Sequence, residues 1–306
     1  MKKIAVLMGG KSSEREVSLL SGKNVAEALA SLGKYEVVPV DLKEESLDAL
    51  PKDVEAVYIA LHGGWGENGG VQAALNALKI PYTGPGVQAS RISMDKVKTK
   101  MVLEMKAVPT AKWSLANPDT EKSPLPLPVV VKPPCDGSSV GISKVQAESD
   151  WAAARDLAFS AIRQSQANDQ PNNQTILVES FIPGREFTVA VVDGEPWPVI
   201  EIVAKGGWYG YEEKYNSDET KYPFLEDGEL AKKMQKIAVD AYRAVGCRGV
   251  TRVDFRVTPE GECYVLELNT SPGFTSHSLV PKSGIRTGLT FAGVCDRILR
   301  SAACDQ

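Results

Sequence analysis

The chain has 306 residues, of which 43% are hydrophobic and 24% charged, a composition typical of a globular protein with two or three domains. A net charge of −4 gives no basic footprint for nucleic acid, and no apolar run approaches the ~20 residues of a membrane span. Five cysteines without CxxC spacing and only two histidines disfavour a disulfide framework or zinc site and favour a reducing cytoplasm.

The first ninety residues alternate between strand and helix patterns. Strands are predicted at residues 3–8, 35–40 and 56–61, and helices at residues 17–32 and from 70 to about 78. This order predicts a parallel sheet with helices on both faces and ligands at the carboxyl ends of its strands. Two glycine-containing loops lie there, at residues 9–16 and 62–70.

The remaining chain mixes further strands and helices. A helix at about residues 90–106 opens a new unit, and the Pro-rich residues 116–128 read as a surface connection. Strands are then predicted at residues 129–132, 142–145, 175–179 and 186–192, and helices at residues 149–166, 229–245 and 290–301. Residues 205–222 have no clean period but hold five aromatic residues, which indicates a functional loop.

Residues 251–269 read as a strand, a turn and a second strand. Alternation divides the first strand into two faces, with Val253, Phe255 and Val257 on one and Arg252, Asp254 and Arg256 on the other. Residues 258–261 are a turn by composition, and a four-residue loop would pair Arg252 with Glu267 and Asp254 with Val265. Glu267 and Asn269 would then share a face with Arg252 and Asp254.

Asp254, Glu267 and Asn269 supply the hard oxygen ligands that magnesium takes, usually together with substrate phosphates. A plain solvated face would also explain the charges. It would not explain the small, hydrogen-bonding run at residues 269–278, which suits backbone contact with a polar ligand. The hairpin therefore predicts a Mg-nucleotide site.

Other segments offer phosphate ligands. The glycines and serines of residues 135–141 allow close backbone approach to phosphate, and Lys132 ends the preceding strand. Lys96 is a weaker candidate, and either lysine could simply be solvated. The strand at residues 176–179 is either core with an edge acid or leads to a bend that presents backbone to adenine, with Glu186 near ribose.

Two familiar nucleotide motifs are missing. Gly10-Lys11-Ser12 resembles the end of a P-loop, but Ala5 stands where that motif requires glycine. No GxGxxG follows the first strand, which disfavours a dinucleotide oxidoreductase. Glu14, Arg15 and Glu16 open the first helix, where acids complement the helix dipole or meet a cationic ligand, and spacing alone favours the former.

Seven motifs resemble those of the D-alanine–D-alanine ligase family in the ATP-grasp superfamily, from about residue 3 to residue 300. They are GGKSSEREVSLLSG, LHGGWGENG, VKPPCDGSSVG, ILVESFIPGREFTV, YEEKYNSDETKY, RVDF and LELNTSPGFTSHS. The resemblance implies an α/β chain that is α+β in its ATP-binding part. It would comprise an N-terminal Rossmann-like domain (1–90), a central ATP-grasp subdomain (91–180) and a C-terminal subdomain (181–306) with a closing loop (205–222).

The resemblance also implies the reaction. Two D-alanines would be joined through a D-alanyl phosphate, for peptidoglycan precursors, by a cytoplasmic homodimer using ATP and two Mg²⁺ ions, for which Mn²⁺ could substitute. Tyr215 favours the dipeptide type. The alternatives are D-serine or D-lactate as second substrate, or a non-catalytic ATP-binding module, against which the intact metal set argues.

Residue roles follow from the resemblance in the same way. For the nucleotide they are Lys96 and Lys132 at the phosphates, Glu179, Phe181 and Ile182 at adenine, Glu186 at ribose, and Asp254, Glu267 and Asn269 at the metals. For the substrates they are Glu14 at the first ammonium with Ser138 and Tyr215, Lys214 at the γ-phosphate, Arg252 and the Gly273 N–H at the oxyanion, and Ser278 and Leu279 at the second carboxylate. His62 would assist the second substrate. Two departures from the family pattern are Cys135-Asp136, a mild change, and Arg256, which could alter charge near the metals.

Overall fold

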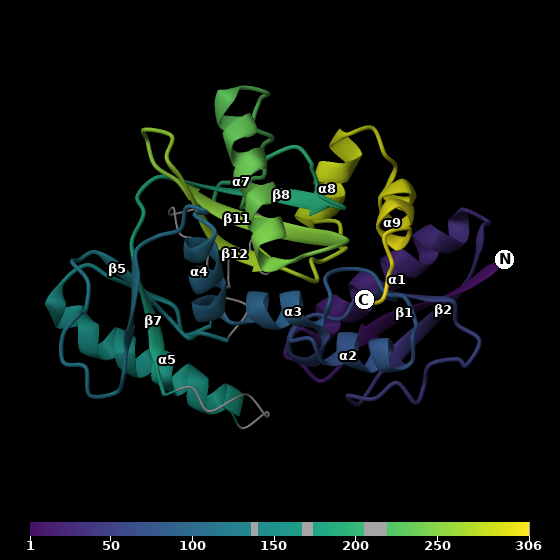
Figure 1. Ribbon diagram of the computed structural model, residues 1–306, viewed down its shortest axis with the longest axis horizontal. Helices are drawn as coiled ribbons and strands as arrows, with labels where there is room; N and C mark the ends of the chain where they lie inside the picture. The colour runs from purple at the N-terminus through teal and green to yellow at the C-terminus, as the bar shows by residue number, and fades with distance from the viewer. Residues whose placement is uncertain (136–139, 167–173, 205–218, 306) are drawn as a thin grey trace.

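The computed structural model describes residues 1–135, 140–166, 174–204 and 219–305 (Figure 1). In these residues three sheets carry helices packed against them. Ser138, Lys214, Tyr215 and most of the expected closing loop lie outside the described residues. None of the described helices is long and apolar enough to cross a membrane.

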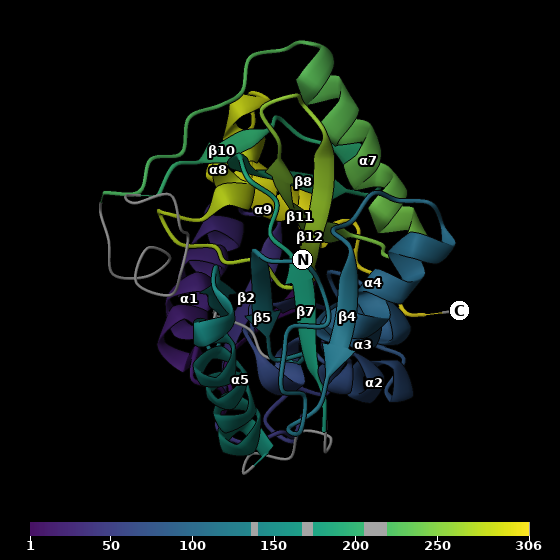
Figure 2. The ribbon, with the colours of Figure 1, turned by 90° about the vertical axis from the view of Figure 1, so that its left-hand side faces the viewer.

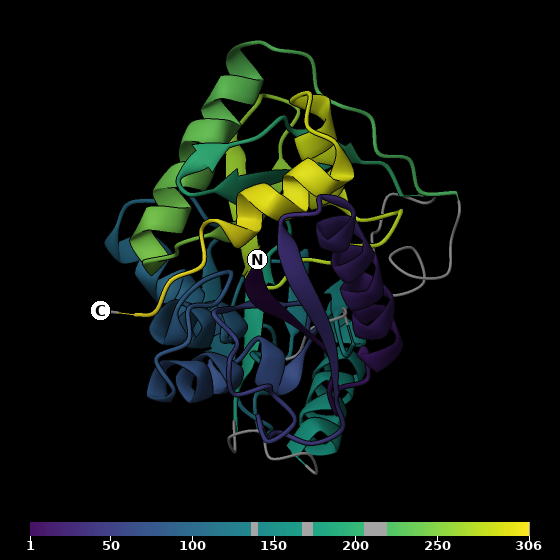
Figure 3. The ribbon, with the colours of Figure 1, turned by 90° about the vertical axis from the view of Figure 1, so that its right-hand side faces the viewer.

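The N-terminal sheet is parallel, as predicted. Its strands are β1 (Lys2–Gly9), β2 (Tyr35–Leu42) and β3 (Ala56–Ile59), in the order β2-β1-β3. Helices α1 (Arg15–Ser31) and α9 (Phe291–Leu299) cover one face, as Figure 3 shows, and α2 (Gly70–Ala77) covers the other. Because β1 is buried on both faces, it reads as an unbroken apolar run.

The second sheet is antiparallel and carries one long helix. It consists of β4 (Trp113–Ala116), β5 (Val129–Lys132), β6 (Ser143–Val145) and β7 (Ile176–Ser180), in the order β4-β7-β5-β6. Figure 2 shows α5 (Trp151–Gln166) lying along it. In the chain, the short 3₁₀ turn η2 (Glu148–Asp150) precedes α5. Buried Trp151 and Ile162 of this helix pack on Val129 and Val178. The sequence pattern missed β4, a strand of four residues.

The third sheet holds the predicted hairpin. Its strands are β8 (Arg185–Val192), β9 (Glu195–Pro196), β10 (Ile200–Ile202), β11 (Val250–Val257) and β12 (Cys263–Asn269), in the order β10-β8-β11-β12 with β9 beside β8. Helix α7 (Glu229–Val245) packs on one face through Met234 and Ala238, against Phe187 and Phe255. The sequence pattern did not predict β9, β10 or the short helix α8 (Leu279–Arg286).

The predicted register of the hairpin is wrong. The strands pair as Phe255↔Val265, Asp254↔Glu267 and Arg252↔Asn269. The loop is one residue longer than expected, because Thr258 N–H donates to the carbonyl of Glu262. That residue alone would turn Glu267 to the opposite face. A bulge at Leu266 adds a second residue, so Glu267 and Asn269 still face Asp254 and Arg252.

The single helix predicted at residues 90–106 is two helices, α3 (Val87–Met94) and α4 (Lys96–Met105). Asp95 separates them with an extended backbone, and its Oδ1 accepts hydrogen bonds from Val97 N (3.0 Å) and Lys98 N (3.1 Å). This is an N-cap, which restarts the helix in a new direction. Lys96 thereby becomes the first residue of α4 and faces the hairpin.

Candidate active site

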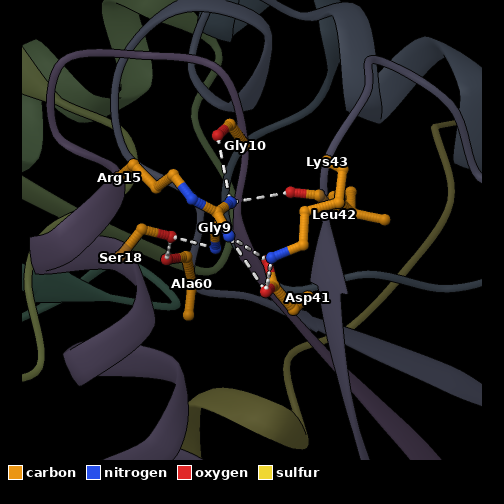
Figure 4. Close-up of polar contacts among 8 residues, drawn as sticks. All are labelled: Gly9, Gly10, Arg15, Ser18, Asp41, Leu42, Lys43 and Ala60. Carbon is orange, nitrogen blue, oxygen red and sulfur yellow. Dashed lines mark hydrogen bonds and ion pairs between the residues drawn. The ribbon is translucent and has the colours of Figure 1, made fainter.

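Arg15, in the first turn of α1, fixes the ends of β1 and β2 (Figure 4). Its Nη2 donates to both oxygens of Asp41 at 2.9 Å, and its Nη1 donates to the carbonyls of Leu42 (2.9 Å) and Gly10 (3.2 Å). Lys43 also contacts the Asp41 carboxylate. Burial raises the pKa of Asp41, but Lys43 and Arg15 more than offset it and leave the pKa lowered. The planar guanidinium therefore anchors the loop that carries Glu14.

Serine hydroxyls tie the same loop to β3. Ser18 Oγ accepts from Gly9 N (2.9 Å) and donates to the carbonyl of Ala60 (2.7 Å), which Figure 4 also shows. Ser12 Oγ donates to the carbonyl of His62 at 2.5 Å. The loops that end β1 and β3 are thus joined, as expected for the carboxyl edge of a parallel sheet.

His62 is buried and bonded at both ring nitrogens. Nδ1 lies 2.9 Å from the carbonyl of Ser271, so it must carry the proton. Nε2 then accepts from Ser21 Oγ (3.0 Å), which in turn accepts from Phe274 N (3.1 Å). Burial lowers the pKa of His62, with partial opposition from Glu14, which agrees with a neutral ring. His62 therefore fastens residues 271–274 to α1.

Glu67, which was not among the predicted site residues, lies in the same loop as His62. Burial and the nearby carboxylates of Glu14 and Glu267 together raise the pKa of Glu67 to about 8, against a lowering by the Gly63 backbone and Arg252. Acids from the first and last parts of the chain are therefore close enough to interact. The sequence did contain a signal that could have identified Glu67, namely an acid inside a glycine-rich loop at the end of a predicted parallel strand.

The hairpin carries a tight polar cluster around Asp254, which is only 5% exposed. Arg252 donates two hydrogen bonds to its carboxylate, from Nε to Oδ1 (2.9 Å) and from Nη2 to Oδ2 (2.8 Å). Thr188 Oγ1 on β8 donates to Oδ1 at 2.6 Å, and Asn269 Nδ2 donates to Oδ2 at 3.0 Å. The predicted gathering of these side chains on one face is present.

These residues suit magnesium held jointly with phosphate. Glu267 Oε2 lies 3.7 Å from Lys96 Nζ, which places a cation suited to phosphate beside the acids. Within the described ranges, no three His, Cys, Asp or Glu side chains form a metal cluster of their own. Asp254 and Glu267 offer two carboxylates to a metal ion. A flip of the Asn269 side-chain amide, which exchanges its nitrogen and oxygen, would add the amide oxygen as a further ligand. Such a set leaves ligand positions for phosphate and water, as magnesium prefers.

A second charged cluster is buried between α4 and the second sheet. Glu179, 2% exposed, lies 3.0 Å from Lys132 Nζ and 3.3 Å from Lys100 Nζ, and Lys100 also donates to Thr110 Oγ1 at 2.6 Å. Burial raises the pKa of Glu179, but the two lysines more than offset it and leave the pKa lowered. Burial lowers the pKa of Lys100 against the opposing effect of Glu179. Lys100 was missed because a lysine on a helix is commonplace.

Residues 271–279 form a compact turn before α8. A Cβ on Gly273 would lie 2.8 Å from Ser278 Oγ, so a larger residue would disturb the turn. Ser278 Oγ accepts from Thr275 N at 2.8 Å, and Leu279 begins α8 with a buried side chain. The turn therefore holds the Gly273 amide and the first amide of α8 in fixed positions.

A parallel-sheet domain beside two antiparallel sheets, with Lys132 on one of them and Asp254 and Glu267 on the other, is the arrangement of an ATP-grasp enzyme. Family models described as "D-ala D-ala ligase N-terminus" and "D-ala D-ala ligase C-terminus" match residues 3–50 and 101–300. The chain belongs to the D-alanine–D-alanine ligase family.

Relatives that match nearly the whole chain support this family assignment. A D-alanine–D-alanine ligase from Bordetella pertussis is 46% identical, and one from Bordetella avium 44% identical, each over 99% of this chain and 95% of the relative. A solved D-alanine–D-alanine ligase from Bacillus anthracis, complexed with ATP, has a TM-score of 0.82 at 30% identity over 98% of this chain and 97% of its own. A VanG D-Ala:D-Ser ligase from Enterococcus faecalis also scores 0.82 at 30% identity, over 98% of both chains.

Proposed function

We propose that this chain joins two molecules of D-alanine into D-alanyl-D-alanine at the expense of ATP, for peptidoglycan precursors. The observation that carries the proposal is the Arg252, Asp254, Glu267 and Asn269 cluster beside Lys96, in a chain that matches D-alanine–D-alanine ligases along its length. A carboxylate resists attack by an amine, so ATP first converts it into an acyl phosphate with a good leaving group.

ATP would lie between the two antiparallel sheets. Lys96 and Lys132 would bind its phosphates, and Glu179, Phe181 and Ile182 would border adenine with Glu186 at ribose. Asp254, Glu267 and Asn269 would hold magnesium, which when bound would neutralise charge on the phosphates during transfer. Arg252, already fixed by Asp254, would stand at the reacting carboxyl.

The first D-alanine would lie at the amino end of α1, with its ammonium on Glu14. A Cβ on Gly63 would meet Glu14 Oε2 at 2.8 Å, so the glycine-rich loop leaves room for this carboxylate. Ser138 and Tyr215 would complete this pocket and Lys214 would reach the γ-phosphate when residues 205–222 close.

The second D-alanine would attack as a free amine. Ser278 and the Leu279 N–H would hold its carboxylate, and Arg252 and the Gly273 N–H would stabilise the tetrahedral oxyanion. His62 would serve this substrate through residues 271–274, since its two nitrogens are bonded within the protein.

Several finer points belong to the same proposal. We expect a homodimer with three domains, bounded at residues 1–90, 91–180 and 181–306, working in the cytoplasm where ATP is available. All five cysteines are free thiols, which suits a reducing compartment. The relatives at 44% and 46% identity are dipeptide ligases, which favours D-alanine over D-serine or D-lactate as second substrate.

Phosphate release from MgATP tests the proposal. We expect turnover with D-alanine and little with L-alanine, D-serine or D-lactate. Asp254→Asn should lower kcat by about 10²-fold or more, because the electrostatic stabilisation of the transferring phosphoryl group is lost. Asp240→Asn is the matched control, since Asp240 pairs with Lys236 on the surface of α7. Equal turnover in both variants would refute the metal assignment, and turnover with D-serine alone would establish the other ligase type.

A further inference from the structure

Arg256 on β11 contacts three of the four residues proposed for the adenosine subsite, Phe181, Ile182 and Glu186. Its Nε donates to the carbonyl of Ile182 (3.2 Å) and its Nη2 to that of Gly184 (2.9 Å). Its Nη1 lies 3.5 Å from Glu186 Oε2, and its guanidinium carbon lies 5.5 Å from the centre of the Phe181 ring. One side chain thus joins the bend proposed for adenine to the acid proposed for ribose.

The arrangement is built into the sheet. Arg256 and Glu186 are direct neighbours across β11 and β8, and their side chains are only 12% and 17% exposed. Gly184 has φ +129°, and a Cβ there would lie 2.0 Å from the carbonyl oxygen of Val257. The bend therefore packs closely against β11. Only a glycine at position 184 allows this approach, which brings the Gly184 carbonyl within hydrogen-bond distance of the Arg256 guanidinium.

We propose that Arg256 is a positioning residue for the nucleoside of ATP, an inference that rests on the proposed function. The guanidinium fixes the backbone of Ile182 for the base and orients the Glu186 carboxylate as an acceptor for ribose hydroxyls. Arg256 thus serves the nucleoside and not the proposed magnesium ligands Asp254, Glu267 and Asn269.

An arginine that only stabilises the fold would make the same contacts. The test must therefore separate a role in stability from a role in positioning the nucleoside. Kinetics of the full-length protein with MgATP at saturating D-alanine should show the KM for ATP raised about tenfold in Arg256→Met, the loss expected for one charged hydrogen-bond set. The kcat and the KM for D-alanine should stay unchanged. Arg256→Lys, which keeps the charge but not the fork, should be intermediate.

The decisive readout compares ATP with 2′-deoxy-ATP and 3′-deoxy-ATP. If Arg256 orients Glu186, the preference for the ribose form should shrink in Arg256→Met by about the same factor as the KM rises. Arg185→Met is the matched control, because Arg185 on the same strand as Glu186 pairs with Glu201. An unchanged preference, or an unchanged KM for ATP, would overturn the proposal.

Calorimetric binding of MgADP to the same variants separates this inference from the proposed function. Weaker MgADP binding in Arg256→Met, with the 2′- and 3′-deoxy forms affected less, would uphold Arg256 even in a chain without ligase turnover. Ligase turnover with equal MgADP binding in all variants would refute Arg256 and leave the ligase intact. Arg256→Gln replaces Arg256→Met if melting curves show the latter to be unfolded.

Discussion

Glu179 is buried and Glu67 is half-buried, yet their surroundings act on the two acids in opposite directions. Burial raises the pKa of each. Around Glu179 the ammonium groups of Lys100 and Lys132 reverse the effect. Around Glu67 the carboxylates of Glu14 and Glu267 add to it, and its pKa reaches about 8. Neighbouring charges, rather than depth alone, decide which acid stays ionised.

The difference separates a cluster in which opposite charges face each other from one in which like charges meet. Glu179 is balanced by lysines of the chain itself, so its cluster can hold its shape at neutral pH without a substrate. Among the described residues, the hairpin side instead brings the acids Glu14, Glu67 and Glu267 close enough to raise the pKa of Glu67, with Arg252 opposing them. The cations that the proposed reaction brings, substrate ammonium and magnesium, would weaken this repulsion between acids.

Lys100→Met should disrupt the buried cluster of Glu179, Lys100 and Lys132 and have the largest effect on stability. It removes one of two cations from buried Glu179, and loss of one partner from a buried ion pair typically costs about 3–5 kcal/mol. Urea denaturation at pH 7 measures the loss. Lys98→Met is the control: Lys98 pairs with Asp95 at 3.0 Å but its side chain is 62% exposed, so the cost should stay below about 1 kcal/mol.

A double variant sharpens the same point. Lys100→Met combined with Glu179→Gln should be less destabilised than the two single losses summed, because no uncompensated carboxylate remains. Strict additivity would mean that Lys100 acts through packing or through Thr110, and that charge balance does not distinguish this cluster.

The sequence predicted the elements better than the contacts between them. Helix α7 was predicted with its observed bounds, since its apolar stripe is long and ends at Gly246. The break at Asp95 escaped because residues on both sides favour helix, and only the cap distinguishes them. The hairpin register failed because a bulge leaves no mark on alternation until the partner strand is known.

The same limit applies to the site. Arg252, Asp254 and Asn269 were predicted to gather because they lie on one hairpin, where local periodicity fixes which faces meet. Lys100 and Glu67 were not singled out, because their importance arises from partners far away in the chain, Glu179 and Glu267. Charge balance between distant segments depends on the tertiary fold, which spacing along the chain does not encode.

Glu67→Gln should relieve the electrostatic conflict on the hairpin side, with an effect that depends on pH. The pKa of Glu67 is raised from 4.5 to about 8 in the folded protein. Its contribution to stability is therefore complete below about pH 4.5 and is lost as the pH rises to about 8. The melting temperature of the ligand-free variant should exceed that of the parent by about 2–4 °C at pH 8, and by less at pH 5.

Melting curves from pH 5 to 9 measure this difference. Glu260→Gln, in the exposed hairpin turn, should show no such trend. A difference between Glu67→Gln and the parent that stays constant across the range would contradict the raised pKa. It would also remove the contrast with Glu179, because both acids would then be ionised throughout.

The Arg15–Asp41 pair lies between the two extremes and should give the smallest effect. Its side chains are 27% and 34% exposed, so water already screens the charges. Arg15→Lys keeps the charge but loses the planar fork to Asp41 and the bonds to Gly10 and Leu42, which should cost about 1 kcal/mol in urea denaturation. Lys43→Met, which removes a more exposed partner of Asp41, should cost less. A loss as large as that of Lys100→Met would show that geometry, and not burial, sets the strength of these ion pairs. No loss would assign the loop's position to the hydroxyls of Ser12 and Ser18 alone.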